Sequence, residues 1–353
     1  MKKQISYVFL IISFLICNII IAQETLNSIK ENKTSKLFRN QEALSIKLKY
    51  SNRNLKKKTN DSTYITTNLS YQNEDETWDS LEVEIRARGN FRKDNCYYTP
   101  VKLKIKKSIA KGTVFKGNKK LKLVIPCKTD KESNDNVIKE YLAYKFYEHI
   151  SPYNFKTRLV NIEYEELRGK KIKSHYFKGF FIEDDKEVAD THDAKILESK
   201  VHPLEQEPII CVKHALFQYM IGNTDFSTTY QHNAKLIYKD KQMFPIPYDF
   251  DMSGLVNPSY AILSTPHLER MNISSVKERK YRGFKRDISI FTQAKSDYLT
   301  IKPQIMECVF SLKSSFDNPK EYERINIYIL DFYKILENEA LFNKNIIEKA
   351  RMN

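Results

Sequence analysis

The chain has 353 residues, and its 59 lysines and arginines outnumber its 44 aspartates and glutamates, for a formal net charge of +15. Apolar residues make up 41% and charged residues 29%, which fits a folded globular protein and excludes a disordered or collagen-like chain. The length allows one large domain or two lobes of ordinary size. The positive charge indicates an acidic partner, but it says nothing about the fold.

The N-terminus has the layout of a secretory signal peptide over residues 1–22. A short positive segment from Met1 to Lys3 precedes an almost wholly apolar run at 5–21, and Ala22 offers a small residue at a cleavage point. We expect an exported protein, in the periplasm, at the cell surface or outside the cell, with no stable membrane span after cleavage. An uncleaved anchor helix and a lipidated cysteine within the run are the alternatives.

Four cysteines lie beyond the expected signal peptide. Cys96 and Cys127 flank two neighbouring strand candidates, so a disulfide between them is plausible in an exported protein, and free thiols are equally open. Cys211 and Cys308 lie in apolar helical stretches and are typical of buried thiols. The spacing of cysteines and histidines does not indicate a zinc site.

The first half of the chain has the apolar period of strands. After a polar leader at 23–40, apolar and charged residues alternate, which predicts half-buried strands. We expect strands at 81–88, 101–106, 121–125, 157–164 and 176–182, and one helix at 134–150. The basic run at 52–58 is interpreted as a solvated loop, with a binding patch as the less favoured alternative.

The second half is mainly helical, with one short hairpin. We expect helices at 207–222, 268–296, 299–315 and 320–350, and paired strands at 233–238 and 243–248. This segregation predicts an α+β protein with two lobes and a cleft between them. The first lobe would be the β-rich residues 41–183, and the second the helical residues 184–353.

Three polar residues, Asp225, Asn233 and Asp249, are expected to meet at one end of the hairpin. Asp225 lies in the loop after a helix that ends near Gly222, Asn233 begins a strand, and Asp249 and Asp251 follow the paired strand. Carboxylate and amide oxygens suit a hard divalent cation that shares its other positions with phosphates and water. The alternative is an ordinary turn-rich segment, since Asn, Asp, Gly and Pro are common in loops.

Several features in a fixed order resemble those of the spore-coat protein H (CotH-type) kinases: an Arg-Gly-Asn turn, a Lys-rich strand, and later an Asp…Asn…Tyr-Asp-x-Asp series. The sequence also resembles a group of exported proteins that share RARGNFR, EYLAYK, GNTD, HN and PYDFDMSGLV, and the resemblance spans about residues 80–260. HipA-type kinases have a similar, more distant pattern. The resemblance implies a two-lobed protein-kinase-like fold, with one helix in a β-rich N-lobe that covers the nucleotide and a mainly helical C-lobe that carries the catalytic and metal loop.

The resemblance also implies roles for the hairpin residues. Asp225 would orient or deprotonate the acceptor hydroxyl, and Asn233, Asp249 and Asp251 would bind Mg or Mn. Eight positions separate Asp225 from Asn233, which is wider than is usual in kinases and indicates an inserted loop at 226–231.

A second set of residues would contact ATP, the co-substrate. Arg88, Gly89 and Asn90 stand where a turn covers the phosphates. Lys102 and Lys104 share one strand face, so either could reach the phosphates, while the solvated position is the alternative for each.

Two glutamates complete the nucleotide site that the resemblance implies. Glu140 would pair with the strand lysine, and an exposed helical position is the equal alternative. Glu183 would touch adenine or ribose at the hinge, although a charged linker is slightly favoured. Lys122, on the next strand, is a third candidate for the phosphate-binding lysine.

We therefore expect an ATP- and Mg-dependent phosphotransferase that acts on Ser/Thr or another hydroxyl of an exported or envelope protein. The alternative is a catalytically inactive pseudokinase that serves as a binding or structural module of the cell envelope. A nucleic-acid partner is disfavoured, because no basic stripe interleaved with stacking aromatics is present.

Overall fold

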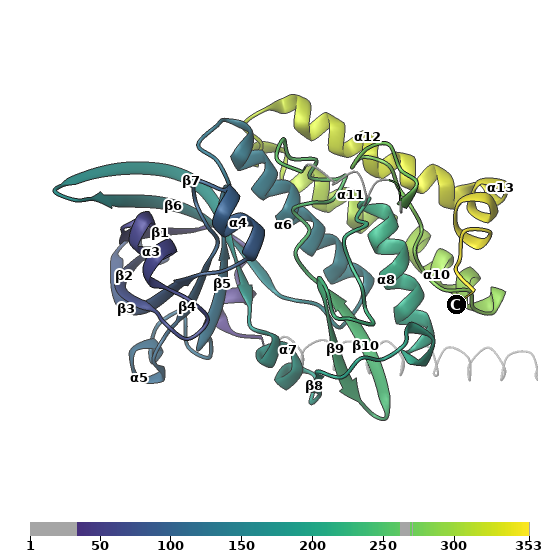
Figure 1. The fold of residues 1–353 in the computed structure, drawn as a ribbon, viewed down its shortest axis with the longest axis horizontal. Coiled ribbons are helices and arrows are strands. Elements are labelled where there is room, and N and C mark those ends of the chain that lie inside the picture. Colours follow the sequence, from purple (N-terminus) through teal and green to yellow (C-terminus); the bar gives the residue numbers. More distant parts are fainter. Residues whose placement is uncertain (1–33, 262–268, 270, 353) are drawn as a thin grey trace, which may run out of the picture.

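The structure, a computed structural model, describes residues 34–261, 269 and 271–352. The strands of the first half close into a barrel, and the second half is mainly helical (Figure 1). Helix α6 (Glu132–Ile150) lies between the barrel and the other long helices. The expected signal peptide at 1–22 and the first part of the expected leader lie outside the described residues.

The barrel has seven strands in the order β1-β2-β3-β4-β5-β7-β6. Their bounds are β1 (Leu44–Tyr50), β2 (Ile65–Gln72), β3 (Trp78–Ala87), β4 (Val101–Lys104), β5 (Lys120–Val124), β6 (Thr157–Arg168) and β7 (Lys171–Glu183). Neighbouring strands are antiparallel, except that β1 and β6 pair in parallel with Leu44 opposite Val160. Alternate side chains fill the interior, as Leu81, Val83 and Ile85 of β3 do.

Four short helices lie in the barrel half. They are α2 (Lys36–Arg39), α3 (Asn52–Lys58), α4 (Asn90–Asn95) and α5 (Lys107–Ala110). The loop expected at 52–58 is wrong, because Ser51 caps α3 and Leu55 is fully buried. The prediction of a loose leader at 23–40 is also wrong over α2, because this helix buries Leu37 and Phe38.

The second half combines helices with a separate small sheet. The helices are α7 (Asp185–Thr191), α8 (Pro208–Met220), α10 (Ile288–Thr300), α11 (Lys302–Ser311), α12 (Pro319–Glu337) and α13 (Glu339–Phe342), with short turns η1 (Pro203–Glu205), η2 (Lys313–Ser315) and η3 (Asn343–Ile347). The strands of the small sheet lie in the order β10 (Gln242–Pro247), β9 (Ala234–Lys239) and β8 (Lys195–Leu197). The helix expected at 268–296 is wrong over 272–287, which is irregular.

Helix α6 is buried on nearly all sides. The outward side chains Val124 of β5 and Phe180 and Ile182 of β7 join the same apolar cluster as α6, α8 and α12. Phe181, between them, points into the barrel core instead. The segments at 123–125 and 180–182 are therefore buried on both faces, which explains why each is a short run of consecutive apolar residues. Within the described part of the chain, no helix has both the length and the apolar character to cross a membrane.

The predicted two-lobed protein-kinase-like fold, with one helix in its N-lobe, is wrong. The β-rich half is a closed barrel with four short helices in addition to α6, and the helical half carries a sheet of its own. Alternating apolar residues identify strands but not their partners. Closure depends on the parallel pairing of β1 with β6, which are far apart in the sequence.

A disulfide joins Cys96 to Cys127, so the structure settles the pairing that the sequence left open. Cys96 follows the last residue of α4, and Cys127 lies just beyond β5. The bridge therefore fixes α4 against the chain that leaves the barrel. Cys211 and Cys308 are unbridged and partly buried.

We expect the double substitution C96S/C127S to lower the free energy of unfolding by about 2–4 kcal/mol, because the bridge restricts the unfolded chain. Urea denaturation monitored by circular dichroism measures this change. A thiol reductant should destabilise the wild-type protein and leave the double variant unaffected. Equal stability of the two proteins under oxidising conditions would contradict the expectation.

Candidate functional site

The end of the β9–β10 hairpin brings Asn233 and Asp249 together. Asn233 directly precedes β9, Asp249 closely follows β10, and the Tyr248 N–H donates to the Asn233 carbonyl oxygen over 3.1 Å. Asp225 reaches the same place because Gly222, with φ of +64°, turns the chain out of α8. The structure thus brings together three of the predicted site residues.

The Asp225 carboxylate is held by its two neighbours at the hairpin end. His232 Nε2 lies 2.9 Å from Asp225 Oδ1. The Asn233 side-chain N–H group donates to the Asp225 backbone oxygen over 2.8 Å and to its Oδ2 over 3.2 Å. The intervening loop is closed by paired backbone hydrogen bonds between Ser227 and His232. The Asn233 amide nitrogen is therefore committed to Asp225, which leaves its Oδ1 for a ligand.

Asp249 and Asp251 have different surroundings. The Asp249 N–H donates to the Tyr144 hydroxyl of α6 over 3.0 Å, and Asp249 has φ of +65°. Asp251 is only 6% exposed, and its Oδ2 lies 3.8 Å from Arg92 Nε. Asp251, predicted as a metal ligand, thus faces a buried arginine.

A buried charge cluster of Arg92, Glu140 and Asp251 lies behind the hairpin end. Arg92, on α4, approaches Glu140 Oε2 at 3.6 Å and donates to the Ile125 carbonyl oxygen over 2.6 Å. Sequence reasoning missed Arg92, although it ends the RARGNFR motif, and it expected a strand lysine beside Glu140. Glu140 Oε1 is buried and accepts no hydrogen bond from any residue that the structure describes.

Burial and crowding of carboxylates change the protonation of this cluster. Burial and the charges of Asp251 and Asp249 raise the pKa of Glu140 to about 8, against the opposing effect of Arg92. Burial and Asp249 likewise raise the pKa of Asp251 to about 6. The crowded carboxyl groups therefore favour uptake of a proton by the Glu140–Asp251 pair, and Arg92 balances the negative charge that remains.

Two lysines of the barrel stand side by side on β4 and β5. Lys102 is opposite Lys122 in the strand register, and its Nζ lies 3.4 Å from Asp184 Oδ2. Lys122 is 2.9 Å from Asp185, and burial lowers its pKa. Its ammonium also lies over the Tyr248 ring, 5.2 Å from the ring centre, which places it near the hairpin end.

Lys104, the other candidate on this strand face, is half exposed and pairs with Glu84 at 2.7 Å. Arg88 lies near the buried acidic residues, so its positive charge lowers the pKa of both Glu140 and Asp251. Gly89, with φ of +76°, turns the chain into α4, which Asn90 begins. The side chain of Asn90 lies outside the description.

Glu183 ends β7 and is only 7% exposed. Its Oε1 accepts a hydrogen bond from the Lys156 backbone N–H. Burial raises the pKa of Glu183 to about 8, more than this hydrogen bond and the Lys156 charge lower it. The carboxyl group predicted to touch adenine or ribose is thus bound to the neighbouring backbone.

The hairpin end offers few metal ligands. In residues 34–261, 269 and 271–352, no group of three histidine, cysteine, aspartate or glutamate side chains could hold a metal ion. The Asp249 carboxylate and Asn233 Oδ1 form a smaller set. Magnesium that binds with a nucleotide takes few protein oxygens, because phosphates and water supply the rest. The residues present therefore fit a nucleotide-bound ion better than a protein-enclosed one.

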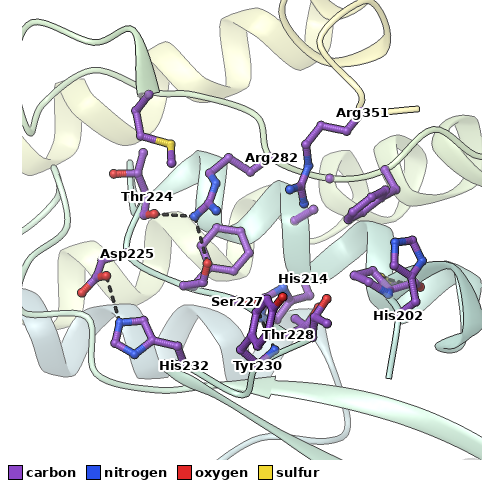
Figure 2. A pocket seen from close by; sticks show the side chains of 18 residues that line it. His202, His214, Thr224, Asp225, Ser227, Thr228, Tyr230, His232, Arg282 and Arg351 are labelled. Carbon is purple, nitrogen blue, oxygen red and sulfur yellow. Dashed lines mark hydrogen bonds and ion pairs between the residues drawn. The ribbon is translucent and has the colours of Figure 1, made fainter. Parts of the chain in front are cut away.

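A cavity of about 590 Å³ lies beside Asp225 and His232 (Figure 2). Helix α8, the loop between α8 and β9, and the irregular chain around Arg282 and Phe284 form its walls. Asp225 therefore stands between two features, the residues of the hairpin end and this cavity.

No known protein family matches this sequence, and no curated protein is detectably similar to it. The function must therefore be argued from the chemistry of the site.

We expect Arg92→Met to destabilise the protein by about 3–5 kcal/mol, because it leaves buried carboxyl groups without their counter-charge. Chemical denaturation at pH 7 measures the loss. Adding both Glu140→Gln and Asp251→Asn to this variant should restore part of the stability, since the neutral amides no longer need a counter-charge. A loss of less than about 1 kcal/mol for Arg92→Met would contradict the structural role of Arg92.

Glu183 has a raised pKa in the folded state because it is buried. The stability that this group contributes is complete below its ordinary pKa and is lost as the pH rises through about 8. Glu183→Gln keeps an acceptor oxygen for Lys156 but cannot ionise. The melting temperature of this variant, relative to wild type, should therefore be higher at pH 9 than at pH 5. Glu323→Gln, at an exposed position of α12, is the matched control.

Proposed function

We propose that the chain is a metal- and nucleotide-dependent phosphotransferase that transfers the γ-phosphoryl group of ATP to a hydroxyl group of an acceptor outside the cytoplasm. The observation that carries this proposal is the meeting of Asp225, Asn233 and Asp249 at the end of one hairpin. Such a set supplies an acid–base group and oxygen ligands at one place.

Asp225 is the candidate for the group that binds the acceptor hydroxyl. Its carboxylate is 42% exposed, so an acceptor can reach it, and His232 and Asn233 fix its orientation. In this position it can accept the proton of the attacking hydroxyl.

Asp249 and the Oδ1 of Asn233 would hold a magnesium ion. When bound, the ion would neutralise charge on the phosphates of the nucleotide. Three cationic groups, Arg88, Lys102 and Lys122, are the candidates for binding phosphate oxygens. Two of them lie near Tyr248, at the hairpin end: the Arg88 charge lowers the pKa of the Tyr248 hydroxyl, and the Lys122 ammonium lies over the Tyr248 ring. Catalysis of this kind depends mainly on positioning and charge stabilisation.

Export of the protein is part of the proposal. The sequence at 1–22 has the layout of a signal peptide, and the Cys96–Cys127 disulfide suits an oxidising compartment.

A catalytically inactive binding module is the second candidate function. It is favoured by the existing partners of the key groups. Asp225 is bound by His232 and Asn233, and the two lysines are paired with Asp184 and Asp185. A site with these contacts could retain a nucleotide without transferring its phosphate.

We expect millimolar Mg-ATP to raise the melting temperature of the full chain by about 2–5 °C, because a ligand that binds only the folded state stabilises it. Asp249→Asn should abolish the rise. Asp240→Asn, at the opposite end of the same hairpin, is the matched control and should retain it.

Phosphate transfer separates the two candidate functions. Asp225→Asn should keep the thermal shift and lose transfer from radiolabelled ATP to an acceptor. The absence of any shift with wild-type protein would contradict nucleotide binding and hence the phosphotransferase. A shift that depends on Asp249, without transfer by the wild-type protein, would favour the inactive module.

A further inference from the structure

The cavity beside Asp225 has a size suited to one small ligand. Its volume of about 590 Å³ falls within the range of small-molecule sites, about 300–1,000 Å³. Asp225 and His232 lie at one end of it, Arg351 and His202 lie toward the other, and Arg282 lies between them (Figure 2).

Two arginines give this cavity a positive charge. Arg282 and Arg351 both line it, and among the described lining residues the acidic side chain is that of Asp225. His214 adds no charge, because burial lowers its pKa to about 3, and burial raises the pKa of the Cys211 thiol to about 11. The cavity is therefore suited to an anionic ligand.

The two guanidinium groups differ in what they contact. Arg282 donates hydrogen bonds to the carbonyl oxygens of Thr224 and Phe226, on either side of Asp225, and so positions the loop that carries Asp225. Arg351 lies over the Phe284 ring, 4.0 Å from its centre, and no ion pair joins it to an acidic residue within the described chain. A guanidinium group stacked in this way still offers its N–H edge to a carboxylate or phosphate.

The remaining walls combine aromatic and hydroxyl groups. Phe226 and Phe284 are buried aromatic residues of the lining, and Ser227, Thr228 and Thr229 add hydroxyl groups. Apolar faces with a few polar groups are typical of sites that orient a small polar ligand.

We propose that this cavity is the acceptor site, and that the acceptor is a small hydroxyl compound that carries a carboxylate or phosphate group. The inference rests on the proposed function. The anionic group binds Arg351, and the hydroxyl group lies at Asp225. In the reaction the hydroxyl proton passes to the Asp225 carboxylate, and the hydroxyl oxygen bonds to the γ-phosphorus of ATP. The bond from that phosphorus to the β–γ bridging oxygen breaks, and ADP leaves.

Calorimetry on the full chain with three sugars of similar size tests this inference. Glucuronate carries a carboxylate, glucose 6-phosphate carries a phosphate, and glucose is neutral. We expect at least one of the two anions to bind tenfold or more tightly than glucose, and the one that does identifies the anionic group. Equal binding of all three sugars, or no binding, would overturn the inference.

Arg351→Gln should weaken binding of the preferred anion at least tenfold. Its backbone hydrogen bonds with Gly283 and Lys285 remain possible, so the variant should fold, as its melting temperature can verify. Lys285→Gln removes an exposed positive charge outside the cavity lining and is the matched control, with unchanged binding expected. Unchanged anion binding by Arg351→Gln would also overturn the inference.

The Mg-ATP thermal shift, measured on the same samples without sugar, separates this inference from the proposed function. A shift without anion binding at Arg351 leaves the phosphotransferase in place and overturns the acceptor site. Anion binding that depends on Arg351 without any shift supports the anion site and overturns its role in phosphate transfer.

Discussion

The architecture depends on a helix that is both central and polar. Buried polar groups of α6 each need a partner, because an unpaired buried group is costly, and the partners come from different parts of the chain. The Tyr144 hydroxyl accepts from the Asp249 N–H at the hairpin end, and Lys139 pairs with Glu321 of α12 at 2.6 Å. A shift of α6 by one residue would break these contacts together. The helix thus sets the position of the hairpin relative to the C-terminal helices.

The local elements of the fold could be predicted more readily than their assembly. Strict alternation at 81–88 identified β3, because a half-buried strand needs that pattern. Closure of the barrel could not be predicted, because the pairing of β1 with β6 depends on residues far apart in the sequence. The run at 52–58 formed a helix for a reason beyond its composition, since Leu55 inserts into the barrel core. Tertiary burial decided these cases over local propensity.

The same distinction applies to the candidate site. The meeting of Asn233 and Asp249 follows from a hairpin that was visible in the sequence, because paired strands bring their outer ends together. The partner of Glu140 was not visible, since Arg92 comes from a helix of the barrel half and only the folded chain brings the two together. The residues of a local turn could therefore be inferred, and the buried ion pair behind them could not.

The disulfide has a consequence for when and where the site becomes complete. Arg92 lies on the short helix that Cys96 ends, and it binds the Ile125 carbonyl oxygen two residues before Cys127. The bridge and the arginine therefore hold the same two segments together. With both thiols reduced, the Arg92 guanidinium group and the hydrogen bond from the Tyr98 N–H to the Cys127 carbonyl oxygen would still join these segments, against the cost of burying the guanidinium group. Oxidation of the two thiols would therefore make the support behind the acidic residues more rigid, and a reducing environment would loosen it.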